Sequence, residues 1–193
     1  MESIQREFAE RIEEWVEEVQ KGESEQYRAI VLHFQRRIHL YCFHMLGNPS
    51  EAEDAVQEVF LKAYTSIATY KPIISFSAWL YRIAHNHCLN LIKQRKKRLQ
   101  LYNIIVRLQV HEPASHAANL VEELLESLSV HDRQLVILKV IEERSFAEIS
   151  EITGDKEATL RKQFERLRKK IVRSSDWNRK ELLDENQAIC TES

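Results

Sequence analysis

Glycine and proline are scarce in this chain, and their placement constrains the fold more than any other feature of the sequence. Only three Gly and three Pro occur among 193 residues, and each lies between stretches with regular apolar spacing. Both residue types interrupt helices, so long stretches without them favour continuous helix. The composition, 44% apolar and 30% charged, is typical of a globular chain. The sequence therefore predicts an all-α protein built from small domains.

Regular apolar spacing through the N-terminal half predicts successive amphipathic helices. An acidic helix is expected first, and a second helix over residues 26–46. Ser50 and Glu53 then form a capping-box pattern, which predicts the start of a third helix. A longer fourth helix is expected over residues 79–98, after a loop that contains Pro72.

The C-terminal half has the pattern of a separate domain. Periodicity fades around Pro113, which predicts a linker. Beyond it, Ser145 and Glu148 form a capping-box pattern before a short helix, and Gly154 ends that helix ahead of a longer one. This order is typical of a helix-turn-helix. The predicted organisation is a first helical domain over residues 1–98, a linker over 99–119, a helix-turn-helix domain over 120–173 and a tail over 174–193.

Charge is distributed unevenly, although the formal net charge is only −2. The N-terminal stretch is acidic, whereas no Asp or Glu occurs between Glu58 and Glu112. Local charge decides whether a polyanion can bind, so this segment is a candidate nucleic-acid surface. One face of the expected fourth helix is a stripe of bases and amides that also includes Leu89: Arg82, Asn86, Leu89, Asn90, Lys93 and Lys97. Such side chains reach phosphates and base edges, although a solvated charged face is the plainer alternative.

Aromatic residues cluster just before this basic helix face: Tyr64, Tyr70, Phe76, Trp79 and Tyr81. Aromatic rings beside a cationic groove suit stacking on unpaired bases. At helical spacing, however, aromatic residues are more often part of a core. Trp79 is the candidate for burial, with Tyr70 and Phe76 freer to reach a nucleic acid.

The longer helix of the helix-turn-helix has a charged outward face: Lys156, Glu157, Arg161, Lys162, Glu165, Arg168 and Lys169. Its N-terminal half is suited to a major groove and its C-terminal half to phosphates. The alternative is a three-helix packing module with a charged surface. The turn, the cap and the basic residues together favour DNA binding.

Three cysteines occur in the chain: Cys42, Cys88 and Cys190. They form no CxxC pair, and the N-terminus lacks the apolar run of a signal peptide, so we expect a reduced, cytoplasmic protein. No apolar run has transmembrane length, which predicts no direct membrane insertion. His44, His85 and His87 add metal-type ligands, but the spacing matches no standard zinc pattern. We expect no metal site and no cofactor.

Two blocks of the sequence resemble a known family. The first reads MLGNPSEAEDAVQEVFLKAYTSI, followed by FSAWLYRIAHNHCLNLIKQRKK, and resembles conserved region 2 of sigma-70-family initiation factors. The second reads SVHDRQLVILKVIEERSFAEISEITGDKEATLRKQFERLRKKI and is similar to region 4, which carries the −35-reading helix-turn-helix. The blocks follow the family order and cover most of the chain, with no region 3 between them, as in the extracytoplasmic-function (ECF) type. The resemblance implies a non-catalytic factor that binds core RNA polymerase, reads −10 and −35 promoter elements and helps to melt DNA.

Matched residue by residue, the resemblance implies three groups of contacts. The face offered to the β′ clamp helices of polymerase consists of Asp54, Gln57 and Glu58. The Tyr70–Ser77 loop is expected to capture a flipped non-template base, and the side chains expected at the melting −10 element are Tyr70, Phe76, Trp79, Arg82, Asn86, Asn90 and Lys93. The side chains expected at the −35 element are Arg161, Lys162, Glu165, Arg166 and Arg168.

Further partners follow from the same resemblance. They are the β flap of polymerase and a cognate anti-sigma factor, often membrane-bound, that masks both domains. A factor of this kind drives strand opening by trapping unstacked bases while polymerase supplies other contacts.

Several positions depart from the family pattern. Asn90 stands where Asp is usual, and residues 156–160 read KEATL in place of the common proline-x-glycine-threonine-valine. Gln163 and Glu165 replace an expected Arg and His. Because a Glu accepts from cytosine whereas an Arg favours guanine, the −35 sequence is not predictable from these residues.

Two other classes of protein are the alternatives. A helix-turn-helix regulator would bind duplex promoter DNA without polymerase. The first matched block favours the sigma factor over that class. An enzyme has the least support, since no phosphate loop, nucleophile constellation or carboxylate pair stands out.

Overall fold

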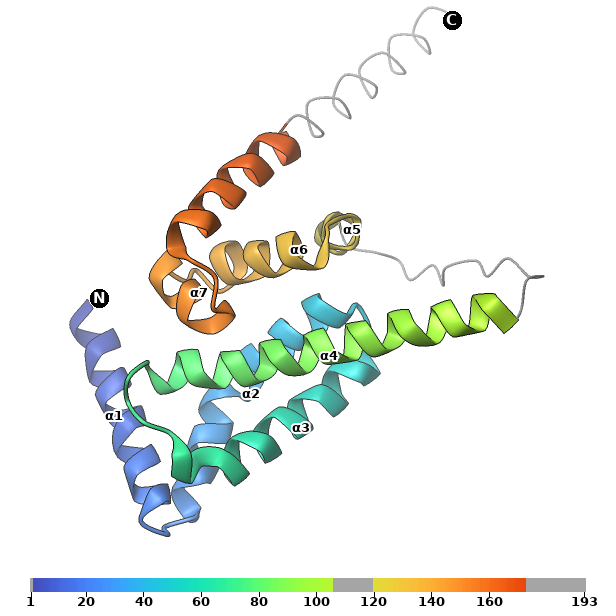
Figure 1. The fold of residues 1–193 in the computed structure, drawn as a ribbon. Helices are drawn as coiled ribbons and strands as arrows, with labels where there is room; N and C mark the ends of the chain where they lie inside the picture. The colour runs from blue at the N-terminus through green and yellow to red at the C-terminus, as the bar shows by residue number, and fades with distance from the viewer. Residues whose placement is uncertain (1, 106–119, 173–193) are drawn as a thin grey trace, which may run out of the picture.

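The structure describes residues 2–105 and 120–172, which form helices joined by short loops (Figure 1). The elements of this computed structural model are α1 (Glu2–Gln20), α2 (Glu25–Leu46), α3 (Pro49–Ser66), the 3-10 turn η1 (Ile67–Thr69), α4 (Phe76–Ile105), α5 (Leu120–Ser127), α6 (Val130–Val136), the π-type turn η2 (Ile137–Ile141), α7 (Phe146–Thr153) and a final helix over 157–172. The predicted all-α class is confirmed. Within these residues, none of the helices combines the length and apolarity needed to cross a bilayer. Most of the predicted linker and the tail with Cys190 lie outside the described residues.

The start of α3 differs from the predicted cap. Its N-cap is Asn48, whose side chain accepts a hydrogen bond from the Glu51 backbone N–H at 3.0 Å, and the predicted Ser50 lies inside the helix. Pro49 favours this register, because its fixed φ and missing N–H suit the first helical position.

The helix α4 is longer than predicted at both ends. It starts at Phe76, before the expected Trp79, and continues past Arg98 to Ile105, into the segment predicted as linker. No Gly or Pro lies between Pro72 and Pro113, so nothing in the sequence stops the helix at its last basic residue.

In the first domain, α2 packs against α1, α3 and α4. Its buried residues recur at three- and four-residue spacing: Ile30, Phe34, Ile38, Tyr41 and Met45. Burial of each such side chain contributes about 1.5–3 kcal/mol before the entropy of ordering is counted. The amphipathic spacing of the sequence is thus the spacing that fills the core.

The second domain contains the predicted helix-turn-helix. Ser145 and Glu148 form the predicted capping box at the start of α7, and Gly154 ends that helix in the left-handed conformation with φ 82°. Leu160 and Leu167 of the final helix are buried at 3% and 4% exposure, which fixes its inward face.

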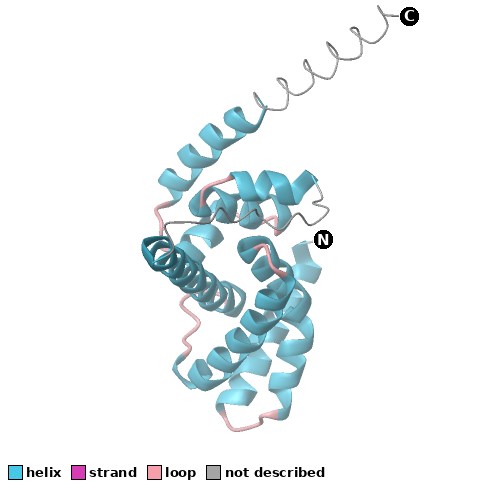
Figure 2. Cartoon of the chain, turned by 90° about the vertical axis from the view of Figure 1, so that its right-hand side faces the viewer, coloured by secondary structure: helices cyan, strands magenta, loops and turns pink. Residues whose placement is uncertain are grey.

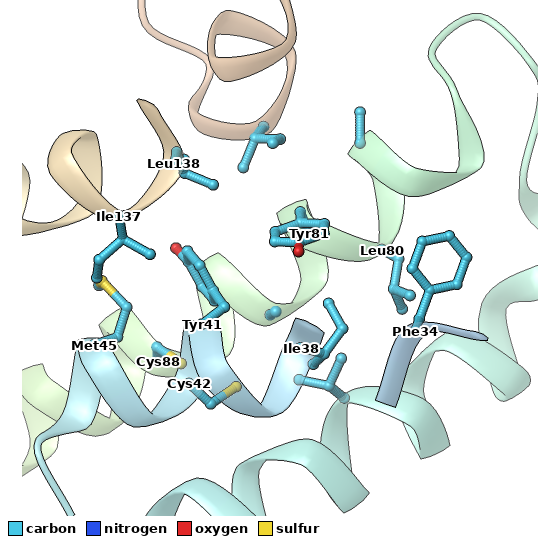
Figure 3. Close-up of a cluster of buried hydrophobic side chains, with 14 of the residues drawn as sticks. Phe34, Ile38, Tyr41, Cys42, Met45, Leu80, Tyr81, Cys88, Ile137 and Leu138 are labelled. Atoms are coloured by element: carbon cyan, nitrogen blue, oxygen red, sulfur yellow. The ribbon is translucent and has the colours of Figure 1, made fainter. Parts of the chain in front are cut away.

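One hydrophobic core joins the two domains. Ile137 and Leu138 of η2 are fully buried and lie beside Tyr41, Met45 and Tyr81 of the first domain (Figure 3). The helix α4 contacts α3 and also α7 (Figure 1), and α2 contacts α6 and η2 directly. In the described residues, Figure 2 shows helices joined by loops. The predicted two-domain organisation therefore has a shared core.

Buried polar groups determine how the domains meet. Glu142, 8% exposed, accepts a hydrogen bond from the Tyr81 hydroxyl at 2.5 Å and lies 3.4 Å from the Arg37 guanidinium. Arg144, also 8% exposed, donates to the Ser77 hydroxyl at 2.7 Å and lies over the Tyr81 ring. A buried charge is tolerated only where it is paired. The first domain supplies the partners of Glu142. The charge of Arg144 is instead paired within its own domain, with Glu148 at 2.8 Å, and gains the Ser77 and Tyr81 contacts on docking.

His85 makes this packing sensitive to acid. It is buried on α4 with Nδ1 3.3 Å from the Tyr41 hydroxyl, and burial together with His131 lowers its pKa from 6.5 to about 4. The unfolded chain therefore binds the proton more tightly. The free energy of unfolding should fall by about 3 kcal/mol as the pH falls from about 6.5 through 4.

Chemical denaturation across this pH range measures the loss. His85→Gln retains every other histidine, so the difference between the two pH profiles isolates His85. Parallel profiles for wild type and variant would contradict the assignment.

Removal of the Glu142 carboxylate should loosen the domains. Glu142→Ala deprives the Tyr81 hydroxyl of its acceptor, at a cost of about 1–3 kcal/mol. Small-angle X-ray scattering should show a larger radius of gyration, and denaturation a lower midpoint. Glu143→Ala removes the same charge from the neighbouring exposed residue and should leave both quantities unchanged. Equal radii for the two variants would show that the Glu142 contact does not hold the domains together.

Candidate nucleic-acid interface

Four predicted DNA-contacting residues share one exposed face of α4, here called the α4 stripe: Arg82, Asn86, Asn90 and Lys93. Intervals of three and four residues keep them on one side of the helix. Leu80, Ala84 and Cys88 are fully buried on the opposite side and fix its rotation. The stripe combines basic and amide groups without a carboxylate, which suits phosphates and base edges.

Arg82 differs from the rest of the stripe, because its guanidinium is already bound. Its Nε donates at 2.8 Å, and its Nη2 also donates, to the carbonyl oxygen of Glu151 in α7. Carbonyl groups near a helix C-terminus carry partial negative charge, which favours this contact. In this arrangement Arg82 joins the two domains.

The 70–75 loop connects η1 to α4 and presents its middle to solvent. Lys71, Pro72 and Ile73 are exposed, Ile73 with 85% of its surface. An apolar side chain so exposed at a loop suits a partner with an apolar face, such as an unpaired base.

The aromatic residues at the ends of this loop are arranged differently from the prediction. Tyr70 and Phe76, expected to be free for DNA, are buried at 6% and 0% exposure, with ring centroids 5.4 Å apart. Trp79, expected to be buried, is only partly so and lies 5.3 Å from Phe76. The loop packs back onto the core, so its ends turn inward. Helical spacing alone does not reveal this.

The final helix presents all five predicted −35 residues to solvent: Arg161, Lys162, Glu165, Arg166 and Arg168. Arg161 pairs with Glu157 one turn earlier and lies over the Phe146 ring. An exposed pair of this kind is worth only about 0.3–0.5 kcal/mol, so the guanidinium can exchange it for a phosphate or base. The predicted outward face of this helix is therefore exposed and accessible to a DNA duplex.

A separate exposed face lies on α3. Asp54 and Gln57 are exposed, and Glu58 lies 3.3 Å from Lys62. Leu61, 57% exposed, extends this face by one turn, and the prediction missed it. The sequence contained the signal for Leu61, since a residue four positions after Gln57 lies next to it on the same helix face. An acidic face with an apolar side chain suits a basic partner surface that is itself partly apolar.

Cys42 and Cys88 lie together in the core (Figure 3). The hydrogen bond with Cys42, together with burial, raises the pKa of the Cys88 thiol. The Cys88 thiol therefore stays protonated and acts in packing, since the reactive form of cysteine is the thiolate. In the described part of the chain, no three His, Cys, Asp or Glu residues are grouped to hold a metal ion.

Two protein-family models match the chain in order. Sigma-70 region 2 matches residues 30–98, which include the α4 stripe and the 70–75 loop. Sigma-70 region 4 matches residues 118–171, which include the helix-turn-helix.

Curated relatives align over most of the chain. The ECF RNA polymerase sigma factor SigW of Bacillus subtilis is 30% identical over 176 residues, covering 83% of this chain and 94% of that protein. The ECF RNA polymerase sigma-E factor of Escherichia coli K12 is 27% identical over 172 residues, covering 81% and 90%.

Solved structures share the fold. CnrH, solved in complex with the cytosolic domain of CnrY, has a TM-score of 0.67 at 21% identity, over 87% of this chain and 97% of that chain. The sigma factor RpoE of Bartonella quintana, solved with the anti-sigma factor NepR, has a TM-score of 0.62 at 20% identity, over 74% and 92%. With both regions matched in order and SigW aligned over nearly its whole length, the chain belongs to the ECF sigma factors of the sigma-70 family, which are not enzymes and direct promoter-specific transcription initiation with RNA polymerase.

Proposed function

We propose that this sigma factor divides initiation among three surfaces. The α3 face binds polymerase, the α4 stripe and the 70–75 loop hold the melted −10 element, and the final helix reads the −35 element. Residues 1–98 and 120–173 are the two working domains, with 99–119 as the linker. The observation that carries this proposal is the α4 stripe, an exposed row of amide and basic groups within a segment that contains no carboxylate.

At the −10 element, the protein holds bases that have left the duplex. Asn86 and Asn90 offer donors and acceptors to base edges, and Lys93 offers charge to a phosphate. Ile73 and the partly exposed Trp79 offer apolar surface to a flipped base. Tyr70 and Phe76 support the loop from beneath and are not direct contacts in this proposal.

At the −35 element, the final helix lies in the major groove. Arg161, Lys162 and Glu165 are suited to base edges, because Arg and Lys donate to guanine and Glu accepts from cytosine. Arg166 and Arg168 are suited to phosphates, which fix the orientation of the helix on the duplex.

On polymerase, Asp54, Gln57 and Glu58 bind the β′ clamp helices, and region 4 contacts the β flap. Leu61 adds apolar contact to the first of these interfaces.

Binding of DNA by the whole stripe requires region 4 to leave α4. The Nε and Nη2 groups of Arg82 donate to the Glu151 carbonyl, so these donors are not available to DNA while the domains are docked. We infer that polymerase binding separates the domains and frees Arg82.

A cognate anti-sigma factor opposes this opening in the cytoplasm. CnrH and the Bartonella RpoE, which share this fold, were solved in complexes with the cytosolic domain of CnrY and with NepR. We propose that an anti-sigma factor, membrane-bound or soluble, also binds this chain.

Run-off transcription from fragmented genomic DNA tests the function directly. Core RNA polymerase should give discrete new transcripts only when this protein is added. Tight duplex binding without polymerase, and without transcripts, would favour the alternative of a conventional helix-turn-helix regulator.

Charge reversal on the α3 face should weaken binding to core polymerase. Asp54→Arg places a like charge against a basic partner surface, so affinity should fall by about 10–100-fold, or about 1.4–2.8 kcal/mol. Fluorescence anisotropy with labelled protein measures it. Glu17→Arg is the matched control, since it makes the same charge change on the exposed side of α1. Equal affinities of the two variants for core polymerase would show that Asp54 does not contribute to this interface.

Loss of a recognition-helix arginine should weaken −35 binding by holoenzyme. Arg161→Ala removes a base contact worth about 1–3 kcal/mol, whereas Arg168→Ala removes a phosphate contact and should lower the salt slope of binding by about one. Arg11→Ala, on the exposed side of α1, is the control. The recognition-helix assignment fails if both region 4 variants match that control at all salt concentrations.

A further inference from the structure

The N-terminal helix α1 lies outside the region 2 match, which begins at residue 30. It nevertheless holds the start of the 70–75 loop. The Gln20 side-chain amide donates to the carbonyl oxygen of Ile67 at 2.8 Å and to that of Tyr70 at 3.0 Å. These two bonds fix the backbone where the chain leaves η1.

The same helix holds the end of the loop. A Glu13 carboxylate oxygen accepts a hydrogen bond from the Phe76 backbone N–H at 2.9 Å, at the first residue of α4. A carboxylate at a helix N-terminus is favoured by the helix dipole and satisfies an otherwise unpaired N–H.

The Tyr70 hydroxyl lies within hydrogen-bond distance of both Glu13 and the middle of the loop. The Tyr70 hydroxyl lies 3.0 Å from Glu13 Oε2 and 2.8 Å from the carbonyl oxygen of Ile74. Burial and the Glu13 charge raise the pKa of this hydroxyl, so it keeps its single proton to donate. Start and end of the loop are thus tied to α1, and the single Tyr70 proton is donated to Glu13 or to the Ile74 carbonyl, while Lys71 and Ile73 stay exposed.

We propose that Glu13 and Gln20 are positioning residues for base capture, and that α1 sets the shape of the loop before DNA arrives. This inference rests on the proposed role of the loop at the −10 element. A loop ordered in advance loses less conformational entropy on binding, so more of the contact energy is available to hold the flipped base. Neither side chain touches the base itself.

The experiment compares Glu13→Ala and Gln20→Ala with Glu17→Ala in the full chain. Glu17 is the matched control, because it lies on the exposed side of α1. Its ion pair is with the exposed Lys21 of the same helix region and not with the loop. Hydrogen–deuterium exchange of the free protein should be faster over residues 67–76 in the first two variants and unchanged in the control.

The functional measurement uses holoenzyme and the single-stranded non-template −10 sequence of a promoter found by run-off transcription. The two test variants should bind this oligonucleotide about tenfold more weakly than wild type, with unchanged affinity for core polymerase. An abasic site is then introduced at each position in turn. At the captured position, wild type and variants should bind equally, because the base that the loop would hold is gone.

The possible results distinguish failure of the positioning role from failure of the proposed function. Equal binding of wild type and test variants to the intact oligonucleotide overturns the positioning role. A deficit that persists at every abasic position also overturns it, since that pattern indicates general damage to the domain. If wild-type holoenzyme makes no transcripts at all, the proposed function fails first and this inference fails with it.

Discussion

The hydrogen bond between Glu142 and Tyr81 is the contact on which the arrangement of the molecule depends. It places a carboxylate of the second domain against a hydroxyl of the first, at 2.5 Å and almost out of water. Arg144 sits over the same ring and is buried equally deeply. Charged groups hidden in this way are stable only with partners. Arg144 pairs with Glu148 inside its own domain, whereas the partners of Glu142, Tyr81 and Arg37, lie in the first domain, so docking of the helix-turn-helix satisfies Glu142.

This contact gives α4 two functions that compete. Its buried side belongs to the shared core, and its outer side carries the α4 stripe. Because Arg82 donates to the Glu151 carbonyl, one member of the stripe is occupied while the domains are docked. Arg82 therefore stabilises the closed arrangement and, in the proposed function, binds DNA when it opens.

Sequence reasoning succeeded where a signal is local. The helix-turn-helix could be predicted because the Ser145 and Glu148 capping box and Gly154 are separated by fixed short intervals, and the structure has both features. The α4 stripe was equally accessible, since its spacing follows directly from helix geometry. Sequence reasoning failed at the start of α3, where the N-cap is Asn48 and not the predicted Ser50. Two residues close in sequence carried competing capping signals.

By itself, the sequence determined the helical class, the order of regions 2 and 4, and the exposed faces of the helices, because periodicity and breakers act within a few residues along the chain. Only the tertiary structure decided that Tyr70 and Phe76 face the core, that Glu13 reaches the start of α4, and that Glu142 meets Tyr81. These contacts join residues far apart in sequence. No local pattern records which distant partner will satisfy a buried polar group or cover an aromatic ring, since that depends on how whole helices pack.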